Sequence, residues 1–352
     1  MDYKSSIDLL KELIALHSFS KEEKLRADFL CQYLQELGFE PKRAANNLWC
    51  QAQEPDNSKP SLLLNSHIDT VRPSDSWTRD PFQPQIEGDR LYGLGSNDAG
   101  AALVSLILTF WRLSRKPQPY NLILGLSAEE EITGAQGIEL LMSALPPIDL
   151  AVVGEPTGMQ AAIAEKGLLV LDCTAQGKSG HAAHDNPDNA IYNAIEDINW
   201  FRTTILPRSS DLLGPVKMSV TQIQAGEKHN IVPDSCRFTV DIRVNEKYSN
   251  QELYDYICTQ VKCAVRARSF NLGSSFIPPA HPIVKACKAQ GLPLYGSPTL
   301  SDQARMHCPS LKLGPGQSLR SHTADEFVLL SEIREGAEVY FNLLDGLEFL
   351  NP

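Results

Sequence analysis

Short apolar runs alternate with helix-like stretches in the first half of the chain, and this alternation limits the possible folds more than any other feature. The runs lie at 61–64, 121–126 and 149–153, and helix-like stretches separate them at 98–113 and 138–145. Short apolar runs of this kind are typical of strands that are buried on both faces and covered by helices. The order therefore predicts a doubly wound α/β sheet.

The middle of the chain follows a different order, β-α-β-β-α-β, which is that of the split ferredoxin-like motif. Its elements are expected at 168–175, 187–205, 216–225, 236–244, 251–261 and 265–272. A strand at 311–313 and a long helix at 324–347 then resume the earlier pattern. We therefore predict a catalytic domain made of residues 1–165 and 277–352, interrupted by an inserted domain at 166–276.

Charge and cysteine usage narrow the class of protein. The chain has 43 Asp and Glu against 32 Lys and Arg, a net charge of −11, so we expect no nucleic-acid partner and no membrane partner. The N-terminus shows no secretory pattern, and the longest mostly apolar run, 99–111, is too short to cross a bilayer. Eight cysteines without regular spacing indicate free thiols in a reducing compartment. We expect a cytoplasmic protein.

Histidine and acidic residues follow the predicted strands, where ligands bind in open α/β sheets. In chain order they are His67, Asp98, the triplet Glu129-Glu130-Glu131, Glu155 and His322. Each has an ordinary structural explanation, such as a helix N-cap for Asp98 or a solvated charge run for the triplet. Together they favour a metal site, because carboxylates packed together without a cation have raised pKa values and destabilise the fold.

The mixture of ligand types points to zinc, with cobalt or manganese as possible substitutes. Two imidazoles with three carboxylates contain too much nitrogen for calcium or magnesium. Five ligands exceed what one catalytic zinc ion usually takes from a protein, whereas two ions that share a carboxylate would use all five. Such a pair lowers the pKa of a bridging water molecule and polarises the carbonyl under attack, and a further carboxylate takes the proton.

The same motifs resemble those of the dinuclear zinc exopeptidases and deacylases. The chain contains Ser-His-x-Asp-Thr-Val, Gly-x-Gly-x-x-Asp, a Glu-Glu pair after a strand, Gly-Glu-Pro-Thr and a final Ser-His, in that order. The family includes acetylornithine deacetylase, succinyl-diaminopimelate desuccinylase and carboxypeptidase G, and the resemblance covers essentially the whole chain. Within the family, the chain looks most similar to the bacterial acetylornithine deacetylase-like N-acyl-ornithine deacylases.

By this resemblance, two Zn²⁺ ions bind per subunit, and Co²⁺ could replace them. His67 and Glu155 hold one ion, Glu131 and His322 hold the other, and Asp98 bridges them.

Catalytic roles also follow from the resemblance. Asp69 orients His67 by accepting its second ring N–H, and the first Glu of the pair is the general base. The triplet allows two registers. We align Glu130 with the base and Glu131 with the ligand, and a slip by one residue would give these roles to Glu129 and Glu130.

The resemblance assigns roles to residues of the inserted domain as well. His181 reaches across a homodimer interface and stabilises the oxyanion of the partner's site, although a plain loop histidine is the alternative. Asn230 lies near the substrate. Arg243 binds a substrate carboxylate with a two-pronged hydrogen bond, unless it forms a salt bridge on the strand surface. Asp302 is a weaker candidate.

The leading functional hypothesis is metal-dependent hydrolysis of an N-acyl-amino acid, namely N-acetyl- or N-succinyl-ornithine in arginine biosynthesis. Succinyl-diaminopimelate desuccinylase and di- or tripeptide exopeptidase are alternatives with the same metal motifs, and a metal-binding homologue without catalysis is a third. Many family members have x-Lys-Gly after the bridging Asp, whereas this chain has Ala99-Gly100-Ala101, a difference that bears on substrate class.

Overall fold

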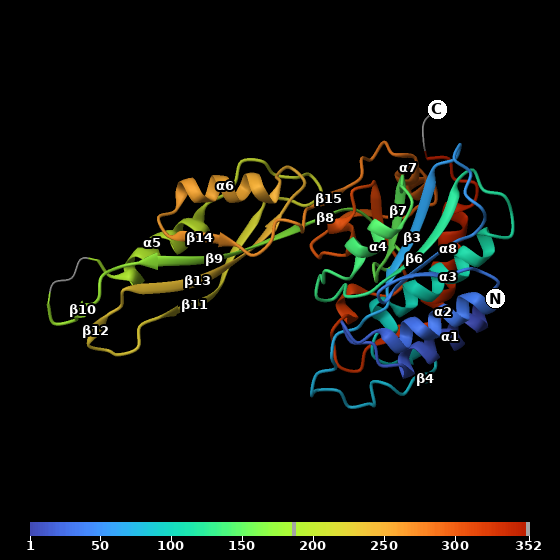
Figure 1. The fold of residues 1–352 in the computed structure, drawn as a ribbon, viewed down its shortest axis with the longest axis horizontal. Helices are drawn as coiled ribbons and strands as arrows, with labels where there is room; N and C mark the ends of the chain where they lie inside the picture. The colour runs from blue at the N-terminus through green and yellow to red at the C-terminus, as the bar shows by residue number, and fades with distance from the viewer. Residues whose placement is uncertain (185–187, 350–352) are drawn as a thin grey trace. The chain divides into compact units, whose positions relative to one another are not determined.

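The computed structural model describes residues 1–184 and 188–349. The chain divides into two compact units (Figure 1). The first unit comprises Met1–Ile163, Phe276–Tyr295 and Ser301–Pro352. The second comprises Ala164–Ser275 and Gly296–Leu300.

A mixed sheet forms the centre of the first unit, with the strand order β1-β2-β6-β3-β7-β17-β8-β15 and β16 beside β8. Its strands are β1 (Lys42–Ala44), β2 (Asn47–Gln51), β3 (Ser61–His67), β6 (Asn121–Ser127), β7 (Leu150–Gly154), β8 (Ala161–Glu165), β15 (Ser275–Phe276), β16 (Leu294–Ser297) and β17 (Ser310–Leu313). The four central strands β6, β3, β7 and β17 are parallel, whereas β2 and β8 join them antiparallel. The predicted α/β fold with a parallel sheet core is confirmed.

Helices cover both faces of this sheet because its central strands are apolar on both sides. The helices of the unit are α1 (Tyr3–Ala15), α2 (Lys24–Glu36), α3 (Ala101–Leu113), α4 (Ile138–Ala144), α7 (Pro282–Ala289) and α8 (Leu330–Leu344). On one face, Leu63 and Ile123 pack with Ile138 and Leu141 of α4. Helix α3 contacts the same strands and is buried along nearly its whole length, with α8 packed against it.

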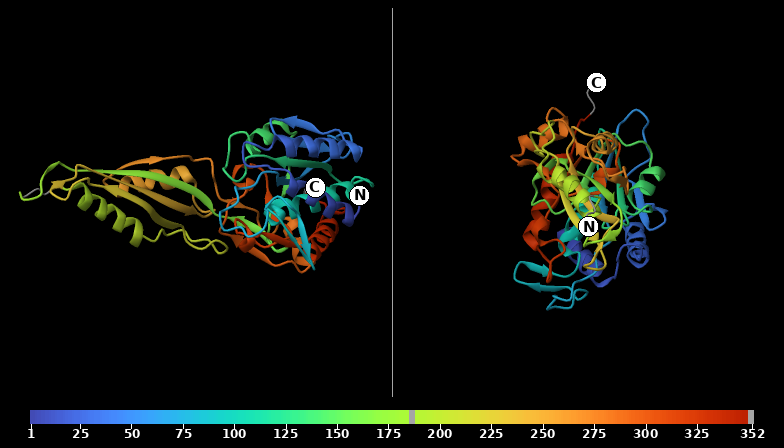
Figure 2. Two further views of the ribbon diagram at one scale, coloured as in Figure 1. Left: turned by 90° about the horizontal axis from the view of Figure 1, so that it is seen from below. Right: turned by 90° about the vertical axis from the view of Figure 1, so that its left-hand side faces the viewer.

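The second unit has the predicted β-α-β-β-α-β order. Its elements are β9 (Gly167–Gln176), α5 (Ala190–Thr203), β11 (Lys217–Ala225), β13 (Ser235–Val244), α6 (Asn250–Gln260) and β14 (Ala264–Ala267). The strands form an antiparallel sheet in the order β11-β13-β9-β14. Alternate strand residues such as Leu171 and Phe238 share one buried core with Phe201 of α5 and Ile257 of α6. Figure 2 shows this unit, coloured green to orange, as a sheet with its helices packed against it.

Several element boundaries differ from the prediction. The expected helix at 324–347 begins only at Leu330, because Phe327–Leu329 forms strand β18 and pairs with β5 (Arg90–Tyr92). The expected helix at 98–113 begins at Ala101, and the expected strand at 265–272 ends at Ala267. Residue 187, the predicted start of α5, lies outside the described residues.

Two further predictions concern chemistry and environment. All eight cysteines are free thiols, as expected. Within residues 1–184 and 188–349, no helix combines the length and the apolar character that crossing a membrane requires.

Candidate metal centre

Three of the predicted site segments follow neighbouring parallel strands of the main sheet. His67 is the last residue of β3, the glutamate triplet follows β6, and Glu155 follows β7. Strand β3 lies between the other two, so the chain leaves β3 for one side and later returns to the other. Such a switch point opens a crevice at the carboxyl end of the sheet, where ligands bind.

Asp98 reaches this crevice by a different route from the one the sequence suggested. It follows β5, which belongs to a separate antiparallel sheet of β18, β5 and β4 (Gln85–Glu87) rather than to the main sheet. Asp98 is also not the N-cap of α3, because Gly100 occupies that position and Asp98 itself has non-helical backbone angles. Helix capping, the ordinary structural explanation for an Asp at this position, therefore does not apply to Asp98.

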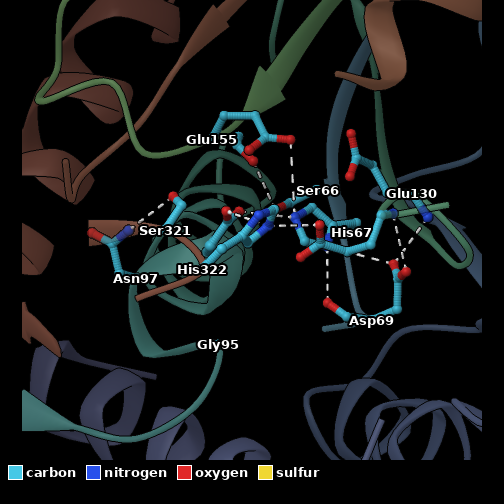
Figure 3. A network of polar contacts seen from close by, with 12 residues as sticks. Ser66, His67, Asp69, Gly95, Asn97, Glu130, Glu155, Ser321 and His322 are labelled. Carbon is cyan, nitrogen blue, oxygen red and sulfur yellow. Dashed lines mark hydrogen bonds and ion pairs between the residues drawn. The ribbon is translucent and has the colours of Figure 1, made fainter. Parts of the chain in front are cut away.

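Asp98 lies between the two histidines. His67 Nε2 is 3.3 Å from Asp98 Oδ1 and 3.9 Å from Glu155 Oε1. His322 Nε2 is 2.9 Å from Glu131 Oε2 and 3.6 Å from Asp98 Oδ2. Each Asp98 oxygen thus faces a different imidazole. Figure 3 shows the side chains of Glu155 and His322 close to His67.

Two overlapping groups of ligand atoms could each hold a metal ion, and in each group these atoms lie within 4.8 Å of one another. The groups are His67, Asp98 and Glu131, and His67, Glu130 and Glu155. Imidazole nitrogen with carboxylate oxygen is a donor set that suits zinc and related transition metals.

The three consecutive glutamates point to different places. Glu129 has a left-handed backbone, φ 53°, and its carboxylate accepts a hydrogen bond from the Gln136 N–H, 3.2 Å away. Glu130 and Glu131 belong to the two groups of metal-binding atoms, and Glu129 does not. The assignment of Glu130 as the base and Glu131 as the ligand stays a prediction, because both residues belong to these groups.

Asp69 connects the β3 end to the glutamate segment. Its carboxylate accepts hydrogen bonds from the Glu130 N–H at 3.0 Å, the Glu131 N–H at 3.2 Å and the Ser20 hydroxyl at 2.6 Å. His67 Nδ1 lies 3.0 Å from the Asp69 carbonyl oxygen and 3.5 Å from its carboxylate. These contacts orient the imidazole and fix the backbone of both glutamates. Figure 3 shows Asp69 beside His67 and Glu130.

Burial shifts the pKa values of the carboxylates upward. It raises the pKa of Glu130 well above its usual range, and the charge of Glu155 adds to the effect. It raises the pKa of Glu155 itself to about 8 and also raises the pKa of Glu131. Divalent cations bound between these groups would offset the shifts by favouring the charged carboxylates.

Acidic neighbours raise the pKa values of the two histidines, His67 and His322. Burial would lower the pKa of His67, but hydrogen bonds to Asp69 and Asp98 raise it well above its usual range. The hydrogen bond to Glu131 raises the pKa of His322 to about 9. Both imidazoles must lose a proton before they can bind a metal ion.

Asp302 connects the end of β3, which carries His67, with the end of β6, which precedes Glu130. Its buried carboxylate accepts hydrogen bonds from Asn65 Nδ2 on β3, at 2.8 Å, and from the Ser127 hydroxyl at the end of β6. The available sequence signal was the presence of Asn65 and Ser127, two polar residues near the ends of otherwise apolar strands.

Glu326 is a buried carboxylate that sequence reasoning missed entirely. It accepts three backbone hydrogen bonds from the Gly95–Asp98 turn. Burial raises its pKa to about 8, and the three N–H donors oppose that shift. No local pattern distinguishes it, because the residue falls inside the segment expected to be helical.

The three predicted residues of the inserted segment lie in the second unit. His181 is exposed on β10 (Gly180–His181), which pairs with β12 (Ile231–Val232), and its Nδ1 accepts the Ala183 N–H at 3.1 Å. Asn230 is exposed just before β12.

Arg243, on β13, forms a two-pronged hydrogen bond with Asp241 at 2.8 and 3.1 Å. This is the strand-surface salt bridge that the sequence left open as the alternative. The catalytic and substrate-binding roles of these three residues stay predictions.

Comparisons with known proteins agree with the geometry. The model of peptidase family M20/M25/M40 matches residues 63–346. Relatives include the succinyl-diaminopimelate desuccinylase of Parvibaculum lavamentivorans, 27% identical over 97% of this chain and 95% of that protein. The enzyme of the same name from Acidiphilium cryptum is 26% identical over 96% of this chain and 97% of that protein.

Solved structures share the fold over nearly the whole chain. A tripeptidase from Staphylococcus aureus matches with a TM-score of 0.77 at 19% identity, covering 98% of each chain. A dinuclear metal-binding peptidase of family M20 from Bacillus subtilis matches with a TM-score of 0.73 at 14% identity, covering 97% of each chain.

These relatives correct one part of the sequence interpretation. The leading ornithine substrate and the role in arginine biosynthesis find no support in them, whereas the desuccinylase alternative does. The predicted family and the predicted enzyme class are confirmed. The chain belongs to peptidase family M20/M25/M40 and is a metal-dependent amidohydrolase.

Proposed function

We propose that this enzyme removes the acyl group from an N-acyl-diamino acid, with N-succinyl-diaminopimelate as its first candidate substrate. The observation that carries the proposal is the position of Asp98, whose two oxygens face different imidazoles while Glu130 stands in the same cluster. The choice of succinyl as the acyl group rests on the desuccinylase relatives, which the chain matches over nearly its full length.

The residues fit two divalent cations, zinc or cobalt. His67 and Glu155 would hold one ion, Glu131 and His322 the other, and Asp98 both. Bound there, the ions would polarise the amide carbonyl and lower the pKa of a water molecule between them.

Glu130 then carries the proton in our proposal. Its carboxylate takes the proton of the attacking water and delivers it to the amine nitrogen as the amide C–N bond breaks. Burial and the neighbouring charge of Glu155 raise the pKa of Glu130 in the metal-free protein, and bound cations would lower it again, so that the ionised carboxylate could accept the proton. Asp69 holds the Glu130 backbone through the N–H bond, so the position of the base is fixed before substrate binds.

We propose further that the enzyme is a homodimer in which His181 serves the partner's site. An N–H donor aimed at the developing oxyanion lowers the activation free energy of hydrolysis, because it stabilises the transition state more than the bound substrate. The exposed position of His181 on a short two-stranded ribbon is compatible with a donor that reaches another subunit.

A substrate panel tests the proposal. Purified zinc-loaded enzyme is assayed with N-succinyl-diaminopimelate, N-succinyl-ornithine, N-acetyl-ornithine, a dipeptide and a tripeptide. The proposal predicts the highest kcat/KM for N-succinyl-diaminopimelate. Good turnover of the peptides with no hydrolysis of any acyl amino acid would identify an exopeptidase instead. A preference for either ornithine compound would retain the deacylase mechanism and overturn the choice of diaminopimelate.

A further inference from the structure

We propose that Glu326 is a positioning residue that holds Asp98 in place to serve two metal ions. The inference rests on the proposed metal centre and concerns how the apoprotein keeps that centre assembled. It starts from the hydrogen bonds that Glu326 makes to the turn carrying Asp98.

The Glu326 carboxylate accepts three backbone hydrogen bonds from one turn. Oε2 accepts the Gly95 N–H, and Oε1 accepts the N–H groups of Asn97 and Asp98, each at 2.8 Å. The Glu326 backbone carbonyl accepts a fourth, from the Gly93 N–H at 3.0 Å. Because Glu326 is only 2% exposed, water does not compete for these donors.

The turn has little freedom to adopt another shape. Gly95 has φ +72°, and a Cβ there would lie 2.5 Å from Thr70 Cγ2. The Asn97 side chain donates to the Gln317 carbonyl at 3.1 Å and accepts the Gln317 N–H at 2.8 Å. Gly95 and Asn97 appear at the edge of the site in Figure 3.

This bracing links two metal ligands that lie far apart in the chain. Glu326 follows His322 by four residues, and it fixes the turn whose Asp98 Oδ2 lies 3.6 Å from His322 Nε2. The segment that supplies one ligand therefore also positions the shared ligand.

The amide of glutamine has the same shape but cannot accept all three bonds. If the amide oxygen accepts from the Asn97 and Asp98 N–H groups, the amide NH₂ faces the Gly95 N–H, and two donors oppose each other. In the flipped orientation the NH₂ faces two N–H donors, so two hydrogen bonds are lost. We therefore expect E326Q to bind Co²⁺ about 10- to 100-fold more weakly than the wild type. The Co²⁺ absorption spectrum should change as well, because the geometry around Asp98 relaxes.

The matched control is D197N. Asp197 is another buried carboxylate that accepts backbone N–H bonds, from Lys262 at 3.0 Å and Cys263 at 2.8 Å, but it belongs to the second unit. We expect this variant to lose stability without a change in Co²⁺ affinity. Equal affinity of E326Q and wild type would overturn the proposal, and so would an equal loss of affinity in D197N.

Hydrogen exchange on the wild-type apoprotein tests the same point if E326Q does not fold. The Gly95, Asn97 and Asp98 amides should be protected before any metal is added. Rapid exchange of these amides would show that the turn is not held by Glu326, and the proposal would be wrong. If the wild type bound no divalent metal, the proposed function itself would fail, and the titration would show this directly.

Discussion

His322 Nε2 lies 2.9 Å from Glu131 Oε2, although 191 positions separate the two residues in the chain. This contact raises the pKa of His322 to about 9, so the imidazole carries a proton at neutral pH in the metal-free protein. Glu155, with a pKa of about 8, is also largely protonated there.

Metal binding must therefore release protons. Below pH 8 the bound protons compete with the cation, so affinity should rise by about tenfold per pH unit for each proton released, and should level off above about pH 9. Calorimetric titration of the apoprotein with Zn²⁺ in two buffers of different ionisation enthalpy measures the number of protons. Binding at pH 7 without proton release would contradict the assignment of His322 and Glu155 as ligands.

Replacement of Glu130 by glutamine should abolish most of the activity. We expect kcat to fall by about 10²- to 10⁴-fold, because the amide cannot accept the water's proton. Metal content, measured by atomic absorption, should stay near the wild-type value.

Glu129→Gln is the matched control, because the Glu129 carboxylate turns away to the Gln136 N–H. Its kcat should remain close to that of the wild type. A large loss of kcat in Glu129→Gln at normal metal content, together with a loss of metal in Glu130→Gln, would shift the register of the triplet by one residue.

Close packing behind Glu155 predicts a structural effect for Gly314→Ala. A Cβ at Gly314 would lie 2.4 Å from the Glu155 carbonyl oxygen and 2.9 Å from the Tyr340 hydroxyl, so the Glu155 backbone must move. We expect a loss of about 1–3 kcal/mol in the free energy of unfolding, together with weaker metal binding. Chemical denaturation measures the first quantity. Exposed Ser318→Ala should change the stability by less than about 0.5 kcal/mol.

The action of His181 in trans can be tested by mixing inactive variants. Glu130→Gln and His181→Ala homodimers should each be nearly inactive. After exchange of subunits, half of the dimers are mixed and each contains one intact site, so about a quarter of the wild-type activity should return. No recovery despite proven subunit exchange would show that His181 acts within its own subunit or not at all.

The parallel core and the ligand types were predictable because both follow from local sequence. Apolar runs mark buried strands, and the residues after them must meet at the carboxyl edge of a parallel sheet. His67 and Glu155 needed no further information. Asp98 was included among the expected ligands, but its position after a strand of the small sheet was not predicted, since strands β4 and β5 are too short to give a clear pattern.

The groups that hold the ligands in place were not predictable from one sequence. Glu326 depends on the pairing of β18 with β5, which brings residues 327–329 beside 90–92. Asp302 was only a weaker candidate in the sequence, because its contacts depend on how a short 3-10 helix (Asp302–Arg305) meets the ends of β3 and β6. Both roles arise from contacts between segments that are distant in the chain, and such contacts cannot be predicted from a local sequence pattern.

Titration of the metal-free enzyme with Zn²⁺, while hydrolysis of an N-succinyl amide is followed, tests the central claim most directly. We predict no activity after chelation, a rise with added metal, and a plateau at two equivalents per chain. Full activity in protein shown to be metal-free would contradict the account.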